Sequence, residues 1–131
     1  MEKALQKSLE IEKWLKPEDE LERAMIADPE FVSGLLWGKP RYGHPEGKVL
    51  YHIREVLDNV DKLNVSPALR RDLRFVTYTH DSFKHLDEKD TYPRDCSKHH
   101  GVFDRKFADK LTDYTALLDL IELHDEAYYS W

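Results

Sequence analysis

Apolar side chains recur along this chain at intervals of three and four residues, which is the spacing of one face of an α-helix. One clear stretch runs from about Glu46 to Leu63. Another begins with Ser66 and Pro67, which are typical of an N-cap and a first helical residue, and runs through about Leu86. The alternation of apolar and polar residues that is typical of strands does not extend over any useful length. The pattern predicts an all-α fold, a compact bundle of six or seven helices.

The N-terminal part of the chain predicts short helices that cover a core. The first helical stripe stops before Pro17, and this proline suits the first turn of a second helix. Asp28 and Pro29 are typical of the N-cap and first residue of a third, short helix. We expect residues 1–38 to form a cover and residues 43–131 to form the helical core of a single domain.

Two polar segments separate the remaining helices. Gly38 to Gly47 is dense in glycine and proline, and Asp87 to Lys98 is polar and turn-rich, so both are expected to be loops. Further helices are expected from about His99 and from near Thr112.

Composition narrows the function classes. The chain has 131 residues, a net charge of −6 and a pI near 5.6, which argue against broad nucleic-acid binding. No apolar run is long enough to span a membrane, and the start lacks a signal-peptide core, so we expect a cytoplasmic protein without a membrane partner. Cys96 is the only cysteine, so a metal site would use nitrogen and oxygen ligands.

Histidine is abundant, with seven residues in the chain. Five of them are candidates for a shared site: His52, His80, His99, His100 and His124. His80 and Asp81 are adjacent on the apolar stripe of a predicted helix, and a buried imidazole beside a carboxylate commonly binds a divalent metal. The competing interpretation is that each inward histidine is a hydrogen-bonded core residue.

Three short segments carry a resemblance to a known family. They are HPEGKVLYH from His44 to His52, HDSFK from His80 to Lys84, and HHG from His99 to Gly101. In this order they resemble the HD superfamily of metal-dependent phosphohydrolases, whose signature is a histidine, a later His-Asp doublet and a distal aspartate. The first segment is similar to one in HD domains appended to bacterial tRNA nucleotidyltransferases. The second departs from the family pattern because Phe83 stands where the family has glycine.

The resemblance implies a set of metal ligands. His52 would be the first ligand and His80 with Asp81 the central pair, in which Asp81 could bridge two ions. The implied cofactor is one or two divalent ions of manganese, iron, nickel, zinc or magnesium. Lys84 would contact the phosphate of the substrate.

The resemblance also implies ligands near the C-terminus. His100, or else His99, and His124 follow the doublet in the family's order. The family's distal aspartate normally lies further along, so either Asp125 takes its place or the site is incomplete.

The function implied by the resemblance is hydrolysis of a phosphomonoester or phosphodiester, such as a nucleotide or a related small molecule. Asp81 and Lys84 would be the catalytic residues, and Arg41 and His44 would join Lys84 in binding the phosphorylated substrate. One alternative is a non-catalytic HD-fold module that senses a nucleotide or binds a partner. Another is a di-iron oxygenase built on the same ligands.

Two further expectations concern the surface. His85 is expected to be exposed to solvent. The aromatic C-terminal end, with Tyr128, Tyr129 and Trp131, suggests either core packing or a homodimer.

Overall fold

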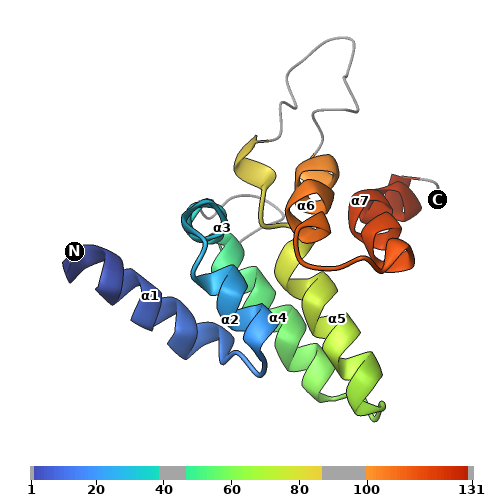
Figure 1. The fold of residues 1–131 in the computed structure, drawn as a ribbon, viewed down its shortest axis with the longest axis horizontal. Helices are drawn as coiled ribbons and strands as arrows, with labels where there is room; N and C mark the ends of the chain where they lie inside the picture. Colours follow the sequence, from blue (N-terminus) through green and yellow to red (C-terminus); the bar gives the residue numbers. More distant parts are fainter. Residues whose placement is uncertain (1, 39–46, 87–99, 130–131) are drawn as a thin grey trace.

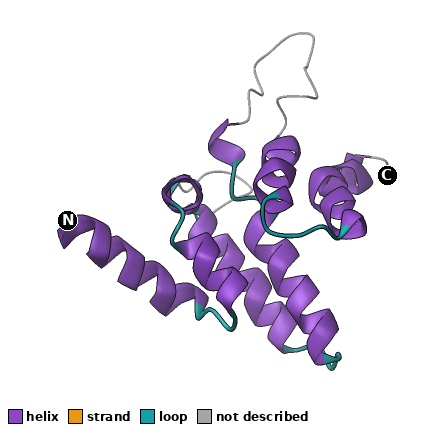
Figure 2. Ribbon diagram, in the orientation of Figure 1, coloured by secondary structure: helices purple, strands orange, loops and turns teal. Residues whose placement is uncertain are grey.

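The computed structural model describes residues 2–38, 47–86 and 100–129, and within them the side chains of 9–38, 47–86 and 101–122. These residues form seven α-helices, one short 3-10 helix and no strand, so the prediction of an all-α fold is confirmed (Figures 1 and 2). The helices are α1 (Glu2–Leu15), α2 (Glu20–Ile26), α3 (Pro29–Leu35), α4 (Val49–Asp61), α5 (Pro67–Thr79), η1 (Lys84–Leu86), α6 (His100–Asp109) and α7 (Thr115–Tyr129).

An antiparallel pair of helices, α4 and α5, forms the centre of the fold (Figure 1). Helix α1 packs along α4, while α6 and α7 pack against α5 and against each other. Helices α2 and α3 link α1 to α4. All seven α-helices contribute buried apolar side chains to one core, which include Ile11, Leu15, Met25, Phe31, Leu35, Ile53, Leu57, Phe75, Tyr78, Phe107, Leu118 and Ile121.

Capping residues fix where the covering helices begin. Asp28 caps α3 ahead of Pro29, as predicted. Helix α2, however, begins at Glu20 and not near Pro17. The Asp19 side chain accepts a hydrogen bond from the backbone of Glu22 at 2.8 Å, so the first turn forms after Asp19.

Helix α5 ends earlier than its apolar stripe predicts. Ser66 caps it as expected, but its last residue is Thr79, and the extension through Leu86 is wrong. The Thr79 hydroxyl bonds back to the carbonyl oxygen of Phe75, and the Ser82 hydroxyl bonds to that of Tyr78. Hydroxyl groups that donate to these carbonyl oxygens compete with the backbone amides that would continue the α-helix. The chain continues instead in 3-10 turns.

The segment between α3 and α4 is closed at its base by two glycines. Gly38 and Gly47 both have positive φ, and a Cβ on Gly38 would lie only 2.3 Å from the Gly47 carbonyl oxygen. The amide of Val49 then donates to the carbonyl oxygen of Trp37 at 2.9 Å. Helix α4 begins at Val49, and Glu46, where it was predicted to start, lies outside the described residues.

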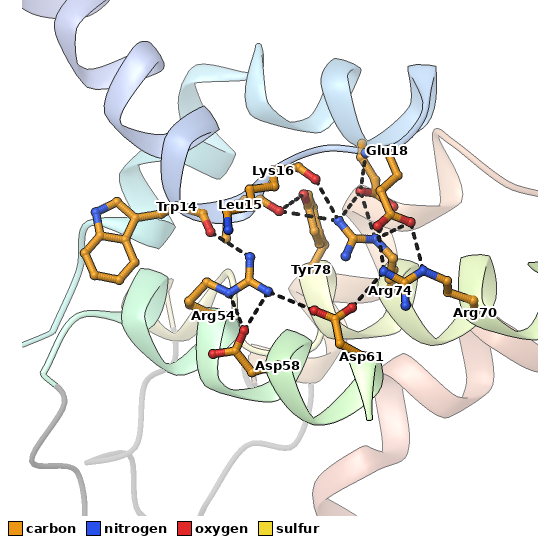
Figure 3. A network of polar contacts seen from close by, with 11 residues as sticks. Trp14, Leu15, Lys16, Glu18, Arg54, Asp58, Asp61, Arg70, Arg74 and Tyr78 are labelled. Atoms are coloured by element: carbon orange, nitrogen blue, oxygen red, sulfur yellow. Dashed lines mark hydrogen bonds and ion pairs between the residues drawn. The ribbon is translucent and has the colours of Figure 1, made fainter. Parts of the chain in front are cut away.

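Side chains of the central helices cap the end of α1 (Figure 3). Arg54 of α4 donates to the carbonyl oxygen of Trp14 at 2.9 Å. Arg74 of α5 donates to that of Lys16 at 3.2 Å, and the Tyr78 hydroxyl donates to that of Leu15 at 3.3 Å. Burial raises the pKa of the Tyr78 hydroxyl, which keeps it protonated as a donor. The carbonyls of the last two residues of α1, which a helix leaves unsatisfied, are thereby paired.

The same arginine forms a buried ion pair with α2. Arg74 and Glu22 are 2% and 3% exposed, and the Arg74 Nη2 to Glu22 Oε1 distance is 2.8 Å. Arg70, one turn earlier, pairs with Glu18 and Asp61 nearer the surface, and its hydrogen bond lowers the pKa of the Glu18 carboxyl. The network holds the N-terminal helices on the central pair.

No helix in the described ranges is both long enough and apolar enough to cross a membrane.

Candidate metal site

Three of the predicted ligands meet where α5 ends. The Asp81 Oδ2 atom lies 3.2 Å from His52 Nε2 and 3.0 Å from His80 Nε2, and the three donor atoms all lie within 4.8 Å of one another. The Asp81 side chain is 7% exposed, whereas His52 is 31% exposed. The cluster is therefore buried on the carboxylate side and open to solvent on the His52 side.

Backbone hydrogen bonds orient the His80 ring. Its Nδ1 atom lies 2.9 Å from the carbonyl oxygen of Thr77 and 3.2 Å from that of Val76. Carbonyl oxygens only accept, so Nδ1 carries a proton, and in this tautomer of the neutral ring Nε2 would present a lone pair to Asp81. A lone pair facing a carboxylate oxygen at 3.0 Å is repulsive unless a second proton or a metal ion lies between them.

The spacing and type of the donors fit a divalent metal. Zinc binds imidazole nitrogen and carboxylate oxygen at about 2.0–2.2 Å, so neighbouring donors lie about 3.3–3.6 Å apart in tetrahedral geometry and about 2.8–3.1 Å apart at right angles. The two nitrogen–oxygen distances of 3.0 and 3.2 Å are slightly shorter than the tetrahedral spacing and close to the right-angle spacing. Two imidazoles and one carboxylate suit manganese, iron, nickel or zinc, and they leave coordination positions open for water or substrate.

Lys84 lies on the other side of the carboxylate. Its Nζ atom is 3.6 Å from Asp81 Oδ1, and its side chain is 15% exposed. An ammonium group and a metal at opposite oxygens of one carboxylate would both attract an anionic ligand. The geometry puts the predicted phosphate contact beside the predicted ligands.

Packing from two other elements holds the Asp81 turn in place. The backbone amide of Phe83 donates to Asp104 Oδ1 of α6 at 3.0 Å. On the α3 side, a Cβ on Gly34 would lie 1.6 Å from the Ser82 carbonyl oxygen, so only glycine permits this contact. The position of Asp81 therefore depends on α3, α5 and α6 together.

Asp104 is a residue that the sequence reasoning missed. It is fully buried and positions the turn that carries Asp81. A signal was present, because Asp104 shares helical spacing with Phe107, Ala108 and Leu111 and so lies on the apolar face of α6.

The other predicted site residues cannot be placed beside this cluster. Arg41, His44 and His99 lie outside the described residues. His100 begins α6, and His124 and Asp125 lie within α7, but their side chains are also outside the described part. The ligand and substrate roles assigned to these six residues stay predictions.

His85 is not the solvated residue that was expected. Its Nδ1 atom is buried and has no hydrogen-bond partner among the described residues, and its ring stacks on Phe83 at a centroid distance of 5.9 Å. Burial lowers the pKa of His85 below its ordinary value of 6.5, although the negative charge of Glu30 opposes the shift.

We expect His85 to make folding stability pH-dependent. Because its pKa is lower in the folded state, the unfolded chain binds the proton first, and stability falls as the pH drops below about 6.5. Urea unfolding of the wild type and His85→Gln at about pH 7.5 and about pH 5.5 checks this. The variant should lose less stability on acidification; an equal loss in both proteins would contradict the prediction.

Searches against protein-family models, curated proteins and solved structures found no match to this chain. The resemblance to the HD superfamily therefore rests on the three short segments of sequence.

Proposed function

We propose that the protein is a metal-dependent phosphohydrolase that acts on a phosphomonoester or phosphodiester, with a nucleotide or a related small molecule as substrate. The observation that carries the proposal is the convergence of His52 Nε2 and His80 Nε2 on one oxygen of Asp81, with Lys84 at the other oxygen. The order of these residues in the sequence, which resembles the HD superfamily, supplies the reaction class.

In this mechanism the chain's own groups hold and orient the reactants. His52, His80 and Asp81 would hold the ion, and the carbonyl oxygens that accept from His80 Nδ1 orient the ring so that Nε2 is the atom available to the metal. A bound divalent ion polarises a phosphoryl oxygen and lowers the pKa of a coordinated water. Lys84 neutralises negative charge that develops on the phosphoryl group. The solvent-facing side of His52 leaves an entry for the substrate.

A screen for turnover tests the proposal. The full chain is stripped of metal and reloaded separately with manganese, iron, nickel, zinc or magnesium. It is then assayed with p-nitrophenyl phosphate, bis-p-nitrophenyl phosphate and a set of nucleotides. We expect hydrolysis with at least one metal and its loss on chelation.

The outcomes separate this function from its alternatives. Stabilisation by a nucleotide without turnover under any metal would contradict the hydrolase and favour the sensing module. Bound iron with oxygen uptake and no phosphate release would favour the oxygenase. A cytoplasmic location and a homodimer belong to the proposal as further expectations.

Lys84→Ala separates substrate binding from metal binding. We expect about a 100-fold loss of kcat/KM for a phosphate ester, because one cation on the transferring group is removed. Metal content should stay within about twofold of the wild type, because Lys84 is not a ligand. Elemental analysis beside steady-state kinetics measures both, with Lys62→Gln, at the exposed end of α4, as the control. An equal loss of metal and activity would contradict the assigned role.

A further inference from the structure

A groove lies between α6, η1 and α3, and the proposed metal ligands do not line it. It encloses about 280 Å³ and is lined by the rings of Phe83, Phe103 and Phe107, by Leu86, and by two lysines, Lys106 and Lys110. The ring centroids of Phe83 and Phe107 are 5.1 Å apart, and both side chains are buried in the core. The floor of the groove is therefore apolar and part of the packed core.

The rim of the groove carries two positively charged side chains, although the protein as a whole has a net charge of −6. Lys106 lies on α6 and Lys110 directly follows the last residue of that helix, and no described residue forms an ion pair with either ammonium group. Lys106 Nζ lies 5.7 Å from the centre of the Phe103 ring, which holds it over the apolar surface. Glu30, on the α3 wall, is the single acidic side chain of the lining.

We propose that this groove binds a small amphipathic anion, a carboxylate with an aliphatic or aromatic body. The apolar body would lie on the phenylalanine rings and Leu86, where its burial excludes water from both surfaces. The carboxylate would lie at the Lys106 and Lys110 side and away from Glu30. The volume of the groove suits a body of about six to eight carbon atoms.

A series of ligands tests separately the apolar contact and the charge contact that the proposal assigns to the groove. Isothermal titration of the full chain with acetate, butanoate, hexanoate and octanoate should show affinity rising about threefold to fourfold for each added methylene. Acetate should not bind, because it has no body to bury. Octylamine, with the same body and the opposite charge, should bind more weakly than octanoate.

Charge variants locate the ligand in the groove. Lys106→Gln and Lys110→Gln should each weaken octanoate binding by about threefold to fivefold, the size typical of an exposed ion pair. Glu30→Gln should strengthen it, because a negative charge on the opposite wall is removed. Lys62→Gln, on an unrelated surface, should leave the affinity unchanged. Opposite effects of the lysine and glutamate changes cannot come from a general loss of folding.

Three results would overturn the proposal. One is equal binding of octanoate and octylamine. Another is an octanoate affinity that none of the three charge changes alters. The third is a dimer, seen by light scattering, that octanoate dissociates, because a second copy of the chain would then be the natural occupant of the groove.

Discussion

Replacing Asp81 with asparagine is expected to remove bound divalent metal from the protein, with affinity falling by about 100-fold or more. The change preserves the size of the side chain but removes the negative charge on which both imidazole nitrogens converge. Loss of a partner that only orients a ligand costs about 10-fold to 100-fold, and loss of a ligand should cost more. Elemental analysis and titration with manganese or zinc measure the effect.

Asp113→Asn is the matched control for this experiment. Asp113 lies on the exposed turn before α7, so its variant should bind metal like the wild type. Circular dichroism of both variants shows whether the fold persists. If the folded Asp81→Asn protein kept its metal, and His80→Ala kept it too, the site proposed at the end of α5 would be wrong.

The largest loss of stability is expected from Glu22→Gln. This change removes the buried carboxylate partner of Arg74 and leaves it only the partly exposed Glu18, 3.5 Å from its Nε atom. Breaking a buried ion pair on one side costs about 3–5 kcal/mol, and the remaining Glu18 places the expected loss toward the lower end. A domain of this size has a free energy of unfolding of about 5–15 kcal/mol, so the loss is a large share of the total. Urea unfolding measures it as a lower midpoint.

Two further variants test whether burial of the Glu22–Arg74 ion pair is the cause of the expected loss of stability. Asp119→Asn breaks the exposed ion pair between Arg105 and Asp119, and it should hardly move the midpoint. In the double variant Glu22→Leu, Arg74→Met, apolar groups replace both charges, so part of the stability should return. A Glu22→Gln midpoint no lower than that of Asp119→Asn would show that the buried pair does not stabilise the fold.

The sequence predicted those structural features that are determined by residues close to one another in the chain. Apolar spacing identified the central helices, and the pairs Asp28-Pro29 and Ser66-Pro67 identified the starts of α3 and α5. The end of α5 was predicted too late, because the competition of the Thr79 and Ser82 hydroxyls for backbone carbonyls is invisible in an apolar pattern.

The site was only partly predictable for a similar reason. The order of the motifs singled out His52, His80 and Asp81, and the structure brings these three together. What positions them comes from contacts between distant segments: Asp104 bonds to the amide of Phe83, and Gly34 packs on the turn. The burial of Arg74 likewise depends on Glu22, which lies 52 residues away in the sequence.

The glycine closure between α3 and α4 has a consequence for how such a protein could diversify. Because Gly38 and Gly47 meet and the Val49 amide is bonded to the Trp37 carbonyl, the ends of the connecting segment are fixed whatever its length. The start of α4, and therefore the position of His52, should not change when residues are inserted between the two glycines. The segment that carries Arg41 and His44, for which substrate contacts are predicted, can therefore change in sequence while His52 keeps its position. If the proposed function is correct, substrate specificity could evolve in this segment separately from the proposed metal site.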